Sequence, residues 1–105
     1  MRVYISGGIT GVENYKKFFD EAEKKLKSEG HEVINPTSFD SVLPKFTYEE
    51  YMRFDMFLLD MCDAIYMLKD WQKSCGANRE YGYALAKDHD VMMEQPLHKY
   101  RTENI

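Results

Sequence analysis

Residues 63–68 read DAIYML, a short run in which every position after the aspartate is apolar. An uninterrupted apolar run of this length is typical of a strand buried on both faces, as in a parallel sheet. Three other runs have a similar β-prone character: RVYIS at 2–6, HEVIN at 31–35, which Pro36 closes, and DVMM at 90–93. These four segments are the predicted strands.

Segments with helical periodicity separate the predicted strands. Between residues 12 and 29 the apolar positions follow the i, i+3/4, i+7, i+11 stripe of a helix that buries one face, and Gly30 is the expected stop. The stripe consists of Tyr15, Phe18, Phe19, Ala22 and Leu26. A second helix is predicted from the TYEE capping box at 47–50 to residue 61. A third is predicted from residue 76 or 77 to residue 87. Alternating strands and helices predict an α/β fold whose parallel sheet is covered on both faces.

The length and composition limit the class of protein. A chain of 105 residues predicts one domain, residues 1–105. Apolar residues make up 44% and aromatic residues 14% of the chain, which excludes an intrinsically disordered protein. Eighteen acidic against fourteen basic residues give a net charge of −4, so no overall positive field attracts a nucleic-acid polymer or an anionic membrane. No apolar run approaches the roughly 20 residues of a membrane span.

The cysteines and the first residues indicate the cellular compartment, and the histidines indicate whether a metal is expected. Cys62 and Cys75 lack CxxC spacing, and two cysteines make no disulfide framework, so we expect reduced thiols in a cytoplasmic protein. The opening MRVYISGGIT has one arginine and a short apolar run, which does not predict a signal peptide. His31, His89 and His98 are scattered, so neither a metal nor another cofactor is expected.

Three segments follow the predicted strands and should meet at one edge of the sheet. They are residues 6–11, 35–39 and 69–76. Ligands of open α/β sheets bind in the crevice beyond the carboxyl ends of the strands. The candidate functional residues therefore belong to these segments and to the helices beside them.

The first candidate is the glycine-rich segment SGGITG at 6–11. Glycines after a strand allow a ligand close to the backbone and leave amides free to face an anion, so Ser6, Gly7, Gly8 and Ile9 are candidate binding residues. The spacing is neither GxGxxG nor a Walker A loop. A simple tight turn would produce the same pattern.

Two acidic residues are the candidates for catalysis. A helical wheel places Asp55 on the apolar stripe of its helix, where a carboxylate costs several kcal/mol unless it is paired or lies in a polar pocket. A partly solvated or a hydrogen-bonded aspartate would fit this place equally well. Glu80 lies near the start of the third helix, at the expected ligand edge, and the helix dipole favours an acid there whatever its role.

Aromatic residues are abundant, with eight tyrosines and six phenylalanines. Tyr4 is a site candidate because its strand runs into the glycine turn. Trp71, after the third strand, could stack on a base or cap the sheet edge. The second helix carries Tyr48, Tyr51, Phe54 and Phe57, more aromatic surface than one helix usually needs. This excess predicts a partner surface and hence a homodimer or higher homo-oligomer.

Three ordered motifs resemble the nucleoside 2-deoxyribosyltransferase superfamily, which includes the 2'-deoxynucleoside 5'-phosphate N-hydrolases. They are YISGGITG at 4–11, Asp55 eight residues before Asp63, and SCGANREYGYALA at 74–86. The resemblance spans residues 3–93. It implies a Rossmann-like (flavodoxin-like) three-layer sandwich with a small four- or five-stranded parallel sheet, and cleavage of an N-glycosidic bond in a small nucleotide or nucleoside.

The resemblance also implies roles for individual residues. Glu80 matches the family's nucleophile, Asp55 the carboxylate that carries a proton to the leaving nitrogen, and Tyr4 the tyrosine that positions the nucleophile. Ser74 and Gly76 join the binding residues. Where the transferases place an aspartate six residues before the nucleophile, Ser74 matches the serine with which the nucleotide hydrolases face a 5'-phosphate. The hydrolases' arginine in the glycine loop is replaced by Thr10.

Three functions therefore stay open. One is a hydrolase that cleaves the base–sugar bond of a 2'-deoxynucleoside 5'-monophosphate, or deoxynucleoside, through a covalent glycosyl-glutamate. Another is a transferase that exchanges bases. The third is a domain that binds or senses a nucleotide without turning it over, because a fold alone does not settle function.

Overall fold

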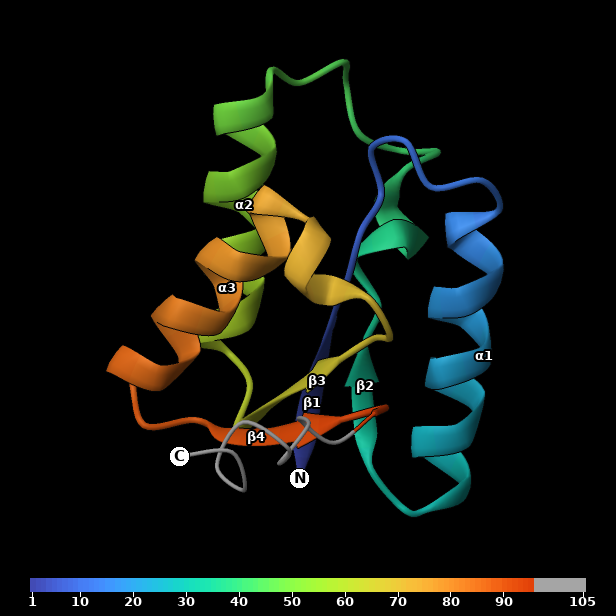
Figure 1. The fold of residues 1–105 in the computed structure, drawn as a ribbon, viewed down its shortest axis with the longest axis vertical. Coiled ribbons are helices and arrows are strands. Elements are labelled where there is room, and N and C mark those ends of the chain that lie inside the picture. Colours follow the sequence, from blue (N-terminus) through green and yellow to red (C-terminus); the bar gives the residue numbers. More distant parts are fainter. Residues whose placement is uncertain (96–105) are drawn as a thin grey trace, which may run out of the picture.

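Four short strands pair in parallel in the order β2-β1-β3-β4. In this computed structural model, which describes residues 1–95, β1 (Arg2–Ser6) and β3 (Ala64–Met67) form the centre of the sheet (Figure 1). The edges are β2 (Glu32–Ile34) and β4 (Asp90–Met93). The predicted parallel sheet and α/β class are confirmed, with four strands in the described residues. The strand order is that of the flavodoxin-like doubly wound sheets, in which the crevice between β1 and β3 is the usual ligand site.

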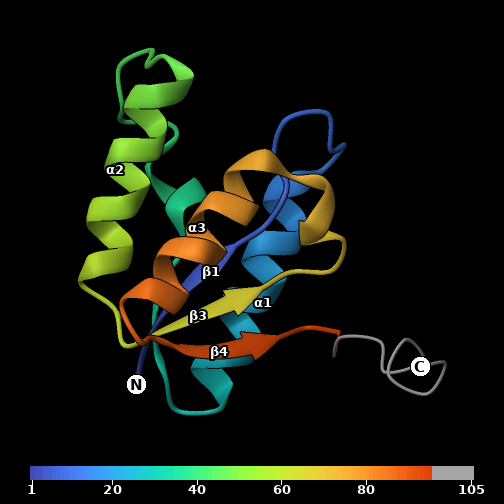
Figure 2. The same cartoon turned by 60° about the vertical axis from the view of Figure 1, so that its left-hand side comes forward.

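Helices cover both faces of the sheet. Helix α1 (Tyr15–Ser28) lies on one face, and α2 (Tyr48–Asp60) and α3 (Cys75–Ala86) lie on the other (Figures 1 and 2). Alternate residues of β1 serve the two layers: Val3 and Ile5 pack toward α1, whereas Tyr4 belongs to the core below α2 and α3. Strand periodicity thus places Tyr4 and Ser6 on the same face as α3.

The element boundaries differ from the predictions by a few residues, for local reasons. Helix α1 begins at Tyr15 rather than near residue 12, because Gly11 and Asn14 both adopt left-handed backbone conformations. The capping box of α2 is confirmed: the Glu50 amide donates to Thr47 Oγ1 over 3.2 Å, and Glu50 Oε1 accepts from the Thr47 amide over 2.8 Å. Gly30 follows α1 with a positive φ, as a helix stop should.

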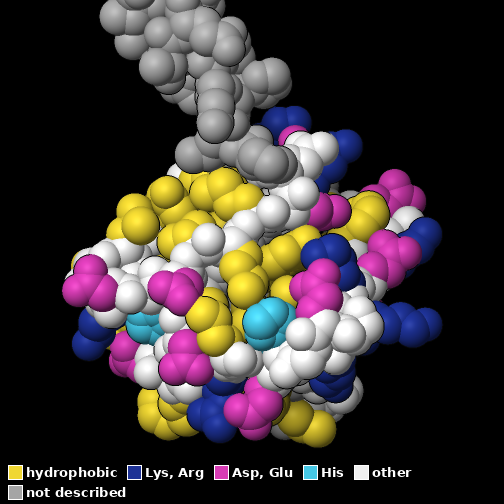
Figure 3. Space-filling view, turned by 90° about the horizontal axis from the view of Figure 1, so that it is seen from below, with side chains coloured by type: hydrophobic (Ala, Val, Ile, Leu, Met, Phe, Trp, Pro, Cys, Tyr) yellow, Lys and Arg dark blue, Asp and Glu magenta, His cyan; other side chains and the backbone are white. Residues whose placement is uncertain are grey.

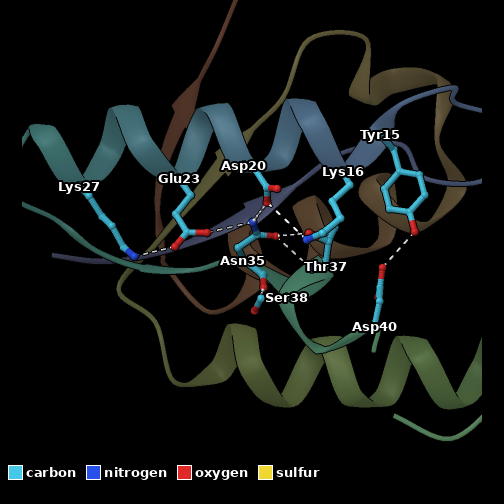
Figure 4. Close-up of polar contacts among 9 residues, drawn as sticks. All are labelled: Tyr15, Lys16, Asp20, Glu23, Lys27, Asn35, Thr37, Ser38 and Asp40. Carbon is cyan, nitrogen blue, oxygen red and sulfur yellow. Dashed lines mark hydrogen bonds and ion pairs between the residues drawn. The ribbon is translucent and has the colours of Figure 1, made fainter. Parts of the chain in front are cut away.

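An unpredicted 3₁₀ helix, η1 (Pro36–Phe39), follows β2 and is held by Asn35. The Asn35 side chain is buried, and its oxygen accepts from the amide and the hydroxyl of Thr37. Its amide donates to Asp20 over 2.9 Å and to Glu23 over 3.0 Å, both on α1 (Figure 4). Since both hydrogens and the oxygen are used, Asn35 fixes η1 against α1.

Replacing Asn35 by aspartate will lower the free energy of unfolding by about 2 to 4 kcal/mol. The change removes both N–H donors and places a third carboxylate beside those of Asp20 and Glu23. Urea denaturation at pH 7 measures the loss. The matched control is Asn14→Asp, at an exposed position that precedes α1, which we expect to change stability by less than about 0.5 kcal/mol. A wild-type midpoint for Asn35→Asp would refute the stabilising role of this network.

The end of the molecule at the amino-terminal ends of the strands carries mixed side chains. Seen from below in Figure 3, hydrophobic side chains lie among lysine, arginine and acidic ones, without a surface of one charge. Among residues 1–95, no helix has both the length and the apolar character needed to cross a bilayer.

Candidate functional site

Glu80 is the buried carboxyl at the centre of the candidate site. It lies in the second turn of α3, and only 5% of its surface is exposed. Tyr4 Oη donates to Glu80 Oε2 over 2.5 Å, and Ser6 Oγ donates to Glu80 Oε1 over 2.6 Å. Both donors come from β1, whose two-residue repeat aims them at the same helix. Each carboxylate oxygen therefore has a fixed hydrogen-bond donor.

Asp55, on α2, lies against Glu80. Burial is the main cause that raises the pKa of Asp55, and the negative charges of Glu80 and Asp40 raise it further. Burial also raises the pKa of Glu80, but hydrogen bonds from Ser6, Tyr4 and Asp55 oppose that rise. Because Glu80 accepts hydrogen bonds from Tyr4 and Ser6, whereas none of the described residues donates to Asp55, the charged form is better stabilised at Glu80 than at Asp55.

Tyr4 is a hydrogen-bond donor in this arrangement. Burial and the neighbouring carboxylates of Glu80 and Asp55 hold its pKa well above the ordinary value of a tyrosine. The phenol thus keeps its proton throughout the physiological range. Its role toward Glu80 is to orient the carboxylate and to stabilise its charge.

The two carboxyls open into a cavity of about 820 Å³. This volume is within the range of small-molecule sites. The walls come from the segments after β1, β2 and β3, from the first turns of α2, and from the start of α3. The cavity thus lies at the carboxyl edge of the sheet, where the topology predicts a ligand.

A family model described as a domain of unknown function (DUF4406) matches residues 1–93. The chain belongs to this family. A search of curated proteins finds no match. Among solved structures, a 2-deoxyribosyltransferase from Bacillus psychrosaccharolyticus is similar over 100% of this chain and 82% of its own, with 19% identity and a TM-score of 0.72. This likeness confirms the fold that the sequence motifs imply.

Most of the predicted site residues of this DUF4406 chain line the cavity. The lining includes seven of them: Tyr4, Gly7, Ile9, Asp55, Ser74, Gly76 and Glu80. Ser6 is fully buried and bonded to Glu80 instead. Gly8 is not among the lining residues and lies beside Val12 and Ser74. Packing also favours glycine at position 7, because a Cβ there would come within 2.7 Å of the Leu68 side chain.

Ser74 caps helix α3 and also lines the cavity. Its hydroxyl oxygen accepts from the Ala77 amide over 3.1 Å, which caps α3. The hydroxyl hydrogen stays available for a ligand. Lys73 and Cys75 line the same end of the cavity, which therefore combines a cation, a hydroxyl and the amino-terminal end of a helix.

Several cavity residues were not predicted. Tyr15, Asp40, Tyr48 and Tyr51 all line the cavity. Tyr15 was predicted only as part of the apolar stripe of its helix, and Asp40 lies in a loop, where no periodicity marks a functional residue. Tyr48 and Tyr51 were assigned to a partner surface because of the excess of aromatic residues on their helix.

Contacts within the chain account for most of the aromatic excess on α2. Tyr48 and Tyr51 face the cavity, and Phe54 packs edge-on against Phe39 with 5.4 Å between ring centroids. Of the four aromatic residues of this helix, Phe57 at 62% and Tyr48 at 49% keep large exposed areas for a partner. The homodimer stays a prediction, with a weaker argument behind it.

Trp71 belongs to the core on the side of α2 and α3 and is not among the residues that line the cavity. It is buried, and its ring lies 4.7 Å from that of Tyr81, centroid to centroid.

Cys62 is buried, and both cysteines are free thiols. Within residues 1–95, no three His, Cys, Asp or Glu side chains are grouped as metal ligands would be.

Proposed function

We propose that this protein cleaves the N-glycosidic bond of a 2'-deoxynucleoside 5'-monophosphate, or of the deoxynucleoside, with Glu80 as nucleophile. The observation that carries the proposal is the pairing in one cavity of Glu80, held by Tyr4 and Ser6, with Asp55, whose pKa burial and the charge of Glu80 raise. Covalent glycosyl transfer needs a carboxylate that attacks and an acid that protonates the leaving group. Similarity in fold to a 2-deoxyribosyltransferase supports the same class of substrate.

In the first step, a Glu80 oxygen attacks C1' of the deoxyribose. The bond between C1' and the base nitrogen breaks, and its electron pair goes to the base. Asp55 transfers its proton to the base, which leaves neutral, and the sugar stays on Glu80 as an ester. The hydrogen bond from Tyr4 keeps the second carboxylate oxygen from turning toward the sugar.

In the second step, Asp55 is a carboxylate and acts as the general base. It takes a proton from the acceptor, which attacks C1' and releases Glu80 as a carboxylate. Water as the acceptor gives a hydrolase, and a second base gives a transferase. Both reactions use the same residues, so the choice depends on what reaches C1' first.

The cavity supports a phosphorylated substrate. Ser74 can donate its hydroxyl hydrogen, Lys73 supplies a positive charge, and the first amides of α3 face the same end. Thr10 lies where the related nucleotide hydrolases carry an arginine, so these groups would have to hold the phosphate without it. We propose the 5'-monophosphate as the preferred substrate on this ground.

The test is a panel of 2'-deoxynucleosides and their 5'-monophosphates, each incubated with the protein and analysed for free base by chromatography. We expect base release, faster by about tenfold or more from the monophosphates, since charge-assisted hydrogen bonds each contribute about 1.5 to 3 kcal/mol. A second free base in the mixture distinguishes transfer from hydrolysis. Binding of the panel without any release would contradict the enzyme and favour the nucleotide sensor.

A further inference from the structure

The cavity has two chemically different ends on either side of Glu80. The sheet order puts β2 on one side of β1 and β3 on the other. Lys73 and Ser74 follow β3 and supply the positive end of the cavity. Tyr15 and Asp40 lie on the β2 side, where the wall is aromatic and acidic. A nucleotide with C1' at Glu80 and its phosphate at the positive end would place its base on the β2 side.

Asp40 is held in position on that side. It follows η1, and its amide donates to the Thr37 carbonyl over 3.2 Å. Tyr15 Oη donates to Asp40 Oδ2 over 3.0 Å across the wall of the cavity (Figure 4). Hydrogen bonds from Asn35 connect η1 to α1, the helix that carries Tyr15. Both partners of the Tyr15–Asp40 hydrogen bond are therefore held in fixed relative positions.

The Asp40 carboxylate has acceptor capacity left for a ligand. A carboxylate can accept about four hydrogen bonds, and Tyr15 uses one. None of the ion pairs formed within residues 1–95 includes Asp40. The group lines the cavity and presents acceptors only. It therefore favours a ligand edge that carries N–H donors and disfavours one that carries a carbonyl oxygen.

We propose that Asp40 is a specificity residue that selects substrates whose base carries an exocyclic amino group, as in a 4-aminopyrimidine or a 6-aminopurine. The inference rests on the proposed function for the position of C1' at Glu80. The amino group donates to the free oxygen of Asp40, while Tyr15 keeps the carboxylate in place. The corresponding oxo bases place an oxygen against the carboxylate instead.

Two matched substrate pairs test this inference: dCMP against dUMP, and dAMP against dIMP. We expect wild-type kcat/KM to favour the amino member of at least one pair by about 10- to 100-fold, the size of one hydrogen bond to a charged acceptor. In Asp40→Asn the ratio should fall to within about threefold, because an amide can turn either its oxygen or its NH₂ group to the base. Tyr15→Phe should keep the direction of the preference, since it leaves the carboxylate.

The control is Glu21→Gln, which makes the same chemical change on the exposed face of α1 and should keep the wild-type ratios. Equal rates for the amino and oxo members in the wild type, or ratios unaffected by Asp40→Asn, would overturn the inference while base release still supported the proposed function. If no substrate is cleaved, calorimetric titration of Glu80→Gln with the same nucleotides decides. If the amino nucleotides bind selectively and Asp40→Asn abolishes this selectivity, the specificity role of Asp40 is supported and the proposed cleavage reaction is contradicted. Binding of neither member of either pair would overturn both.

Discussion

Glu80→Gln will lower the rate of base release by at least about a thousandfold. The glutamine amide cannot form the glycosyl ester, so the reaction loses its nucleophile while the cavity keeps its shape. Chromatographic rates on the best substrate of the panel measure the effect. Intact-mass spectra of acid-quenched enzyme should show a sugar adduct on the wild type and none on Glu80→Gln.

Folding and binding serve as controls for this loss. Glu80 is buried, and burial alone penalises its charged form, so a neutral glutamine should leave the thermal midpoint unchanged or raise it. Glu21→Gln, on the exposed side of α1, should retain full activity. Retention of activity in folded Glu80→Gln would show that Glu80 is not the nucleophile.

Asp55→Asn will reduce base release by about 10²- to 10⁴-fold, the usual contribution of a general acid. The loss should be much smaller with a 4-nitrophenyl 2-deoxyriboside, whose leaving group departs without a proton. The wild-type rate should fall as pH rises above neutrality, because burial and Glu80 raise the pKa of Asp55 and the rate depends on its proton. Asp55→Asn should lack this alkaline fall. Equal losses on both kinds of leaving group would exclude the acid role.

The same carboxyl makes stability depend on pH. The pKa of Asp55 is higher in the folded than in the unfolded chain, so the folded state binds the proton more tightly. The contribution of Asp55 to stability is therefore complete below the unfolded pKa near 4 and is lost as pH rises through the folded pKa. Urea midpoints at pH 5 and pH 9 should differ less in Asp55→Asn than in the wild type, by roughly 1 to 3 kcal/mol in free energy. A wild-type pH dependence in the variant would rule this out.

The strands and helices could be predicted because their signals are local. The apolar run at 63–68, the capping box at 47–50 and the stop at Gly30 each depend on neighbours in the chain. The predictions missed η1, because its hydrogen bonds come from one side chain, Asn35, which itself depends on two acids on another helix. Such a network has no sequence period.

The candidate site was predictable to a lesser degree. Asp55 stood out because a carboxylate on an apolar stripe is costly without a polar neighbour, and Glu80 is such a neighbour. The pairing of Tyr4 with Glu80, separated by 76 positions, followed from the family resemblance and not from spacing. Asp40 and Tyr15 meet only once α1 and η1 are packed, so no pattern along the chain connects them.

Helix α3 also fixes the distance between Ser74 and Glu80. Ser74 caps it and Glu80 follows six positions later, so about 9 Å of rigid helix separates the two. In the proposed reaction, this length sets the distance between the reacting carbon of the substrate and the end of the substrate that binds near Ser74. An inserted residue between them would also swing the glutamate about 100° around the helix axis, away from its two hydroxyl partners on β1. Loops elsewhere at this edge of the sheet can change length without moving Glu80 away from Tyr4 and Ser6. We therefore expect changes in substrate specificity to come from those loops, while the stretch from Ser74 to Glu80 keeps its length.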